Sequence, residues 1–192
     1  MTAGAGAGPP HRAPFLARPG VLIAVAVVVG LVVVAVLLLT GAFGGGDRGR
    51  APGPVREVSV QGLRDFAASK GGAVYWAGDL PGRRLELSQT GEGNVFVRYL
   101  TGDAVVGDGR PAFTTVGTYP AEGAYAEVRK RSRGRDMENK PAPGGGLATW
   151  SKKRPSSVYV GYPGSDLLVE VYDPDPQRAR TLALSGDVGP IR

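Results

Sequence analysis

A stretch of 23 residues without a charge, residues 21–43, constrains this chain more than any other feature of its sequence. From residue 21 to residue 39, every residue is apolar except Gly30. As a helix rising about 1.5 Å per residue, the stretch would span roughly 34 Å, enough to cross the ~30 Å hydrocarbon core of a bilayer. A single segment can satisfy its backbone amides in lipid only as a helix. The sequence therefore predicts one transmembrane helix at residues 20–43.

The competing interpretation is a cleavable signal peptide. Such a peptide has an apolar region of about 7–15 residues, followed by a small-x-small cleavage site. Residues 40–42 fit that site, but the apolar run is too long and continues to Phe43, and no cysteine is present for lipid attachment. We therefore expect an uncleaved single-pass anchor in the cell membrane.

Positive charges beside the span do not set its orientation. Arg12 and Arg18 precede it, and Arg48, Arg50 and Arg56 follow it closely, whereas the positive-inside rule needs an excess on one side. A short tail, one span and one folded domain form the usual layout of a signal anchor, which favours a domain outside the cytoplasm. A cytoplasm-facing regulatory domain is the alternative if the topology is reversed.

The rest of the chain divides into three parts. Residues 1–19, rich in Ala, Gly and Pro, are expected to form a disordered tail, and residues 44–56 a flexible Gly/Pro linker. Residues 57–192 are long enough for one domain with its own core.

Sequence periodicity within residues 57–192 predicts an α+β fold. Three helices are expected, one capped by Ser59, one opened by Pro120 and one capped by Asp175. The strand-like runs lie at residues 73–77, 84–90, 94–100, 113–118, 147–151, 157–162 and 167–172. Short connections between these runs imply a small antiparallel sheet with the helices on one face.

Two parts of the predicted domain have similar spacing. Trp76 and Trp150 are each followed by a proline five residues later, and by a strand-ending tyrosine 23 and 22 residues later. This pattern suggests a duplicated helix-plus-three-strand unit. The alternative is a chance likeness between two ordinary meanders, since proline and aromatic residues are common at strand ends.

Several kinds of catalysis are excluded by residue type. The only histidine is His11, in the predicted tail, and the chain has no cysteine. The predicted domain therefore cannot use a Ser-His-Asp triad, a histidine acid–base group or a His/Cys zinc site. No Gly-x-Ser-x-Gly or Ser-x-x-Lys element is present. We predict no cofactor, and an enzyme stays open only as one that uses carboxylates or a Ser/Lys pair.

Basic residues concentrate between residues 129 and 154, where nine Lys/Arg accompany two acidic residues. In the rest of residues 57–192, acidic residues outnumber basic ones, and such asymmetry attracts anionic surfaces and polymers. The candidate binding residues are Arg129, Lys130, Arg131, Arg133, Arg135, Lys152, Lys153 and Arg154. We predict that they share one face and bind anionic lipid or an anionic envelope polymer. The alternative is a solvated helix end and a polar hairpin turn.

Other partners are not expected. No recognised module or stacking-aromatic motif accompanies the basic segment, so nucleic-acid binding is not predicted. Asp173 and Asp175 are explained by a strand exit followed by a helix cap. Asp103 and Asp108 lie on a glycine-rich loop whose spacing does not match a calcium-binding loop. No metal site is predicted.

Five stretches of sequence resemble a known family. They are VYWAG (74–78), FVRYL (96–100), TVGTYP (115–120), SVYVGYPGSD (157–166) and VEVYDP (169–174). They are similar to a family of single-pass membrane-anchored proteins from high-GC actinobacteria that has no assigned activity, and the similarity covers most of residues 73–190. The resemblance implies an anchor followed by one domain, and it carries over no functional residue.

From these features we expect a single-pass protein of the cell envelope. Its extracytoplasmic domain would bind or scaffold a partner without catalysis. A membrane-anchored enzyme is the second interpretation.

Overall fold

The structure, a computed structural model, describes residues 53–192. The predicted tail, the predicted transmembrane helix and most of the predicted linker lie outside the described residues. Between residues 53 and 192, no helix is both long and apolar enough to cross a membrane.

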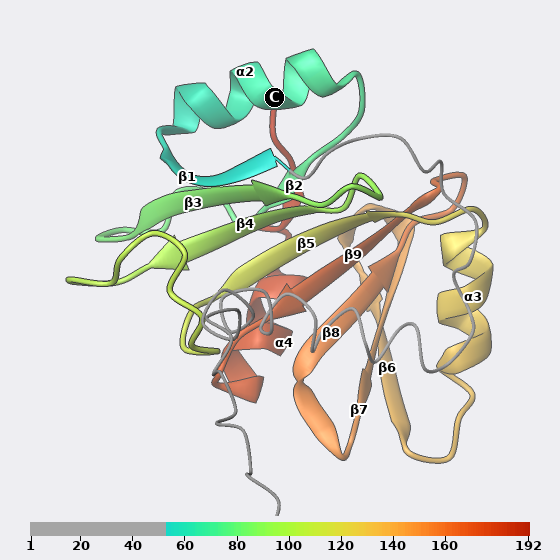
Figure 1. Ribbon diagram of the computed structural model, residues 1–192. Helices are drawn as coiled ribbons and strands as arrows, with labels where there is room; N and C mark the ends of the chain where they lie inside the picture. The colour runs from blue at the N-terminus through green and yellow to red at the C-terminus, as the bar shows by residue number, and fades with distance from the viewer. Residues whose placement is uncertain (1–52) are drawn as a thin grey trace, which may run out of the picture.

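One antiparallel sheet of eight strands forms the centre of the described domain (Figure 1). Its strands lie in the spatial order β1-β3-β4-β5-β9-β8-β7-β6. Their bounds are β1 Gly53–Val58, β3 Arg84–Gln89, β4 Val95–Leu100, β5 Thr115–Pro120, β6 Met137–Ala142, β7 Gly146–Ser151, β8 Arg154–Gly161 and β9 Leu167–Tyr172. Two short strands, β2 (Tyr75–Trp76) and β10 (Gly189–Pro190), pair with each other outside this sheet.

Three α-helices connect the strands: α2 (Val60–Lys70), α3 (Ala124–Arg131) and α4 (Pro176–Ser185), with a short 3-10 turn, η1 (Pro143–Gly145), before β7.

Capping side chains set where α2 and α4 begin and end. The Ser59 hydroxyl accepts a backbone N–H three residues later at 3.0 Å, and the Asp175 carboxylate accepts one two residues later at 2.9 Å. These bonds satisfy N–H groups that the start of a helix leaves without a partner. Gly71 and Gly186 end the two helices with positive φ, a conformation that suits glycine. The starts of both helices match the sequence prediction.

One face of the sheet carries the main apolar core. Alternate residues of the central strands, such as Val97, Val116 and Val171, lie on this face and are fully buried. Leu63 of α2 and Leu182 of α4 belong to the same core. Figure 1 shows α2 above the β1 end of the sheet and α4 on the side turned away from the viewer. The period-two alternation of the strands therefore builds one continuous core.

The opposite face is covered by different elements, and we call it the polar face. Its buried side chains include Glu86 and Glu170 beside aromatic rings, and Arg98, whose side chain is 15% exposed, pairs with Glu86. Helix α3 packs on β7, β8 and β9 at one end of this face. The connection between β4 and β5, residues 101–114, covers the other end, where Phe113 packs with Leu100 and Ala104.

The fold class is confirmed, with differences in detail. The described domain is α+β, with an antiparallel sheet and three helices, and each predicted strand-like run contains a strand. The helices cover both faces of the sheet, not one, and strands β1, β6 and β10 were not predicted. β1 includes residues 53–56, which had been assigned to the linker. β6 is a polar edge strand with a proline, so it has no alternation of apolar residues to detect.

Pro120 ends a strand and does not open a helix. It pairs with Leu167 as the last residue of β5, beyond the point where β4 stops pairing. Its missing N–H therefore leaves no bond to β4 unmade. Helix α3 begins later, at Ala124, after Gly123 with a φ of 65°.

The predicted duplication is wrong. Trp76 lies in β2, which pairs only with β10 in the described domain. Trp150 lies in β7, which pairs with both β6 and β8 inside the main sheet. Residues 73–100 and 147–172 therefore have different strand orders, and their equal spacing of tryptophan and proline is a coincidence.

Candidate functional site

The fold brings the two predicted basic segments together. The first runs from the last turn of α3 to the start of β6, and the second is the turn between β7 and β8. The backbone N–H of Lys152 donates to the carbonyl oxygen of Asp136 at 2.8 Å. Beside this bond, Met137 of β6 pairs with Ser151 of β7. We call the combined surface, residues 129–135 and 152–154, the basic corner.

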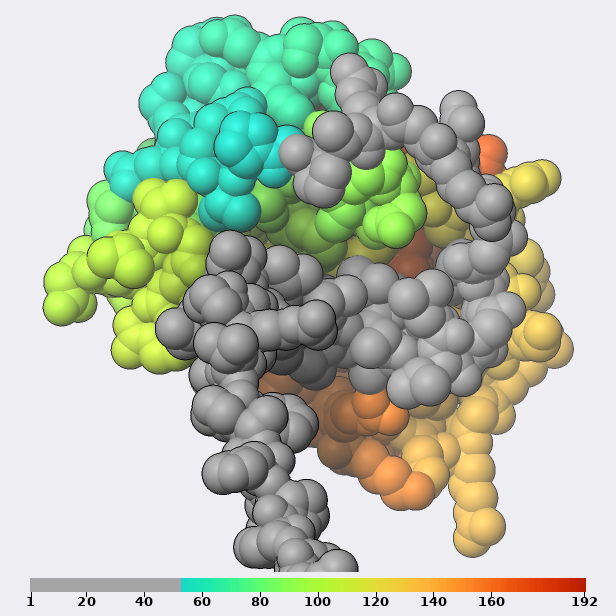
Figure 2. Space-filling model, in the orientation of Figure 1, coloured from blue at the N-terminus to red at the C-terminus, as the bar shows by residue number. Residues whose placement is uncertain are grey.

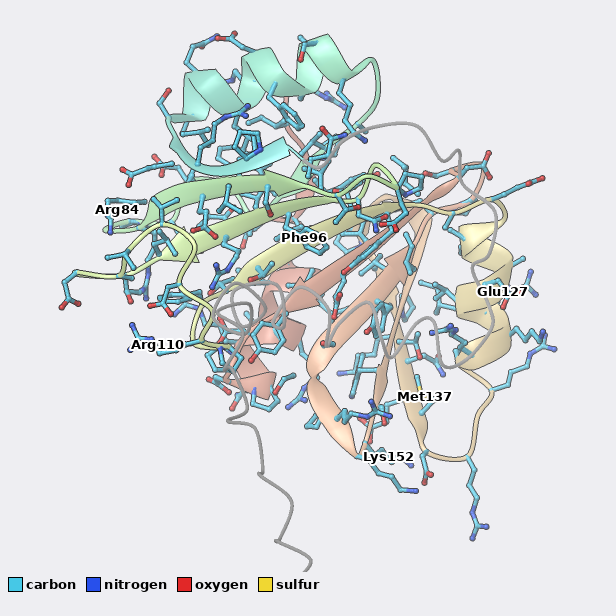
Figure 3. All side chains as sticks on the ribbon, in the orientation of Figure 1. Arg84, Phe96, Arg110, Glu127, Met137 and Lys152 are labelled. Atoms are coloured by element: carbon cyan, nitrogen blue, oxygen red, sulfur yellow. The ribbon has the colours of Figure 1, made fainter. Side chains whose placement is uncertain are left out.

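The basic corner lies at one end of the sheet. In Figure 2 the gold atoms that follow α3 and the orange atoms of the β7–β8 turn form the lower edge of the domain. Figure 3 labels Lys152 and Met137 in this region. Seven of the eight predicted cations are exposed, and only Arg131 is half-buried. The structure thus groups the predicted residues, and what they bind stays a prediction.

Two lysines of the basic corner have acidic neighbours. Lys153 Nζ lies 2.7 Å from a carboxylate oxygen of Asp136, and this hydrogen bond lowers the pKa of Asp136. Lys130 lies at 4.0 Å from Glu127, one turn earlier on α3. Both lysines are largely exposed, so each pair contributes little to stability. The charge of Lys152 also lowers the pKa of Asp136, so this carboxylate partly offsets two lysines of the corner.

Four other cations of the corner are not held by polar contacts within the described domain. The side chains of Arg133, Arg135, Lys152 and Arg154 form no hydrogen bond or ion pair with any residue between 53 and 192. Their positive charge is therefore available to a partner.

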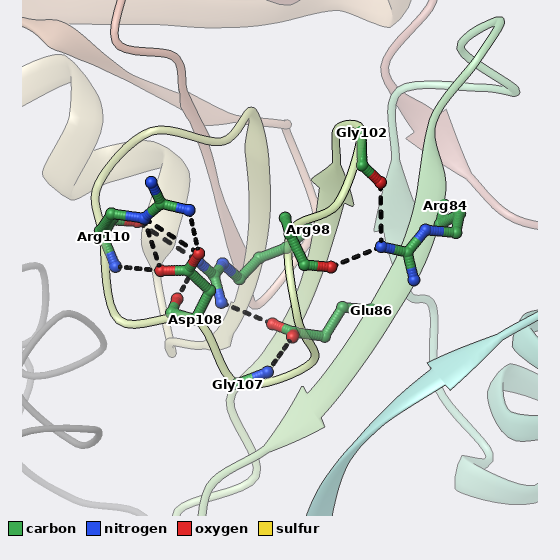
Figure 4. Close-up of polar contacts among 8 residues, drawn as sticks. Arg84, Glu86, Arg98, Gly102, Gly107, Asp108 and Arg110 are labelled. Atoms are coloured by element: carbon green, nitrogen blue, oxygen red, sulfur yellow. Dashed lines mark hydrogen bonds and ion pairs between the residues drawn. The ribbon is translucent and has the colours of Figure 1, made fainter.

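A charge network on the polar face was missed by the sequence analysis. Glu86 of β3 is 1% exposed, and Arg98, its register partner on β4, donates to it at 2.6 Å. The same carboxylate accepts the N–H of Gly107, and Arg98 also donates to the carbonyl of Asp108 at 2.6 Å. Figure 4 shows both side chains reaching the loop between β4 and β5. The buried ion pair therefore fixes the backbone of that loop.

One sequence signal could have found this pair. The alternation in β3 indicated that Glu86 faces away from the core, but alternation does not say whether that face is covered. If residues 84–90 and 94–100 form a hairpin about the three-residue turn between them, positions 86 and 98 lie opposite each other. Opposite charges at such a pair would have indicated an ion pair.

A second buried carboxyl, Glu170 of β9, lacks a cationic partner among the described residues. It is 2% exposed, and the Tyr119 hydroxyl donates to its Oε2 at 2.6 Å. Its Oε1 accepts no hydrogen bond within the described domain. Burial raises the pKa of Glu170, and the hydroxyls of Tyr119, Ser157 and Tyr159 oppose this shift. Ser157 and Tyr159 affect this pKa from nearby positions, because neither hydroxyl forms a hydrogen bond with Oε1.

Gly117 makes room for this contact. It pairs with Glu170 in register, so the Tyr119 side chain, two residues along β5, must cross position 117 to reach the carboxyl. A Cβ at Gly117 would lie 2.8 Å from Cε2 and 2.9 Å from the hydroxyl oxygen of Tyr119. An alanine would therefore collide with the ring.

The acidic residues weighed from the sequence have structural roles. Asp173 is buried, and it accepts the Thr114 hydroxyl at 2.6 Å and the backbone N–H of Asp175 at 2.9 Å. Asp108 pairs with Arg110, which lowers the pKa of Asp108 to about 2. Over residues 53–192, no three side chains of the metal-binding types gather to hold an ion.

Comparison of the chain with known proteins finds no matching family model, no matching curated protein and no matching solved structure. Function must therefore be inferred from the charge, burial and geometry of the domain itself.

Proposed function

We propose that this is a single-pass membrane protein whose domain lies outside the cytoplasm and binds an anionic partner, without catalysis, through the basic corner. The bond between Lys152 and Asp136 carries the proposal, because it joins two basic segments into one surface. The predicted span at residues 20–43 supplies the anchor.

The composition of the corner supports a binding role. Like charges placed close together destabilise a folded domain unless something offsets them. Asp136 pairs with Lys153 and partly offsets Lys152, and Arg133, Arg135 and Arg154 have no offset among the described residues. An anionic partner would supply it.

A carboxylate enzyme is the second candidate, and Glu170 is the observation that favours it. A carboxyl with a raised pKa can act as a general acid or base near neutral pH. Glu170 is 2% exposed, however, and a catalytic group must come within hydrogen-bond reach of its substrate. The exposure of the basic corner favours binding over catalysis.

Charge reversal with a matched control tests the binding role. The full chain would be placed in nanodiscs of neutral phosphatidylcholine, and binding to polyphosphate and to phosphatidylglycerol vesicles would be measured at rising salt. The test variant carries Arg133→Glu, Arg135→Glu and Lys152→Glu. The control carries Arg56→Glu, Arg64→Glu and Arg192→Glu, which makes the same change in net charge on the α2 side of the domain.

We expect the test variant to lose at least tenfold in affinity for one or both probes at low salt. The control should lose much less, because its substitutions lie away from the corner, and the difference should widen as salt rises to physiological ionic strength, where surface charge is screened over about 8 Å. Equal losses in the two variants, or no binding by the unaltered chain, would overturn the proposal.

A topology reporter fused after Arg192 tests the predicted location. The proposal expects the reporter outside the cytoplasm. A reporter found in the cytoplasm would mean that the basic corner lies on the cytoplasmic side of the membrane, and would support a regulatory domain instead.

A further inference from the structure

We infer that the partner of the basic corner is an extended polyanion with repeated phosphate or carboxylate groups. The corner binds this polymer away from the membrane that holds the anchor, and it does not bind the lipid of that membrane. The inference rests on the proposed function and names the partner class.

The basic corner lies diagonally opposite the point where the chain enters the domain. β1 is one edge of the sheet, and β7 lies six strand positions away, or about 29 Å at ~4.8 Å per step. Gly53 shares a cross-sheet row with Ala148, four residues before Lys152. Those four residues add about 13 Å along the strand direction, so Gly53 and Lys152 lie about 30 Å apart.

The predicted linker limits how often this corner can reach the membrane. Because β1 takes in residues 53–56, only residues 44–52 separate the predicted span from the sheet. A flexible linker of that length has a root-mean-square extension of about 17 Å. A corner about 30 Å from such a pivot comes within the ~8 Å screening length of the membrane in about a third of orientations or fewer.

The corner also lacks the apolar residues of a lipid-binding surface. Surfaces that settle into a membrane interface combine cations with exposed apolar side chains. The large hydrophobic residues exposed on the described domain are Val55, Val105 and Val106, and none of them belongs to the basic corner. Charge alone therefore has to supply the affinity, as it does for polyanions.

The side chains of the corner suit phosphate and carboxylate groups. Five of its eight cations are arginines, whose planar guanidinium groups donate paired hydrogen bonds to such anions. The cations lie on the last turn of α3, on the loop that follows it and on the β7–β8 turn (Figure 2), where an extended chain can contact successive cations.

Acetylation of the lysines gives a readout that separates polymer from lipid. The full chain would be placed in nanodiscs of phosphatidylcholine alone or with phosphatidylglycerol, and treated with an acetylating ester. Mass spectrometry would follow Lys152 and Lys153, with Lys70 on α2 as the internal control. Sodium polyphosphate and sodium poly-L-glutamate would be added separately to the neutral nanodiscs.

We expect at least one polymer to slow acetylation of Lys152 and Lys153 fivefold or more. Phosphatidylglycerol in the disc should slow it less than twofold, and the polymers should leave acetylation of Lys70 unaffected. Protection by polyphosphate alone would assign phosphate groups to the partner, and protection by both polymers would assign general polyanion binding. Protection by phosphatidylglycerol as strong as that by polymer would overturn the inference and leave the proposed function standing. Protection by none of the probes would overturn both.

Discussion

The polar face of the sheet and the basic corner both concentrate charge, yet they place it in opposite surroundings. On the polar face, Glu86 is 1% exposed, and it is matched by Arg98 and by a backbone N–H. In the basic corner, Arg133, Arg135 and Lys152 are exposed, and their side chains form no hydrogen bond or ion pair within the described domain.

This difference separates charge that maintains the fold from charge that is free for recognition. A buried ion has lost its water and must find partners inside the protein, so removing one member of a buried pair is costly. An exposed ion keeps its water, and its replacement changes stability little. The polar face should therefore govern stability, and the basic corner should govern binding.

The largest effect should follow Arg98→Met on the polar face. This change leaves the Glu86 carboxylate buried without its cation, and we expect a loss of about 3–5 kcal/mol in the free energy of unfolding. Urea unfolding followed by circular dichroism measures it. Arg110→Met is the control, because Arg110 contacts the same Phe113 ring but is 70% exposed. A loss for Arg98→Met as small as that of the control would show that the network does not maintain the fold.

A smaller effect is expected for Gly117→Ala. The new methyl group would displace the Tyr119 ring from Glu170, and overpacking of this kind costs about 1–3 kcal/mol. Gly72→Ala is the matched control, since a Cβ at Gly72 meets no atom within 4 Å. The measurement is again the free energy of unfolding, and equal values for the two variants would contradict the close contact at Gly117.

The next effect depends on pH and concerns Glu170. Burial raises its folded-state pKa above the usual 4.5, so the folded chain holds this proton more tightly than the unfolded chain does. The resulting stability is complete below pH 4.5 and is lost as pH rises through the folded-state pKa. Compared with Glu170→Gln, the unaltered protein should therefore lose stability over this range, measured by urea unfolding at successive pH values.

Tyr119→Phe sharpens the same test. The Tyr119 hydroxyl lowers the pKa of Glu170, so its removal should raise that pKa further. The loss of stability relative to a Tyr119→Phe/Glu170→Gln double variant should then be larger and extend to higher pH, because only the folded-state pKa rises. Parallel pH profiles in all of these variants would show that Glu170 does not titrate in this range.

The smallest effect on stability is expected in the basic corner. Arg133→Glu, Arg135→Glu and Lys152→Glu together should change the free energy of unfolding by no more than about 0.5 kcal/mol per site, as for ordinary surface changes. The substitutions leave the contact between Asp136 and Lys153 in place. A loss of several kcal/mol would mean that these cations maintain the fold.

Local chemistry made much of this fold predictable. Ser59, Gly71, Asp175 and Gly186 mark helix ends through interactions within a few residues, and alternation marks strands with one apolar face. β6 escaped prediction because it lies at an edge and buries little on either side. The pairing of β2 with β10 joins residues more than a hundred positions apart, and no local signal encodes it.

The basic corner could be predicted as two segments, because exposed charge stands out in composition. Their meeting depends on β6 pairing with β7, which brings Asp136 to Lys152. Glu170 could not be recognised as buried, since its burial depends on both faces of the sheet being covered. Alternation reports one face only.

One experiment tests the separation of fold and recognition most directly. Unfolding free energy and polyphosphate binding would be measured on the same preparations of the unaltered chain, the Arg133/Arg135/Lys152→Glu variant and Arg98→Met. We predict that the corner variant keeps its stability and loses at least tenfold in affinity, whereas Arg98→Met loses stability and, under conditions where it stays folded, binds as the unaltered chain does. Loss of stability in the corner variant, together with unchanged polyphosphate binding, would contradict the account.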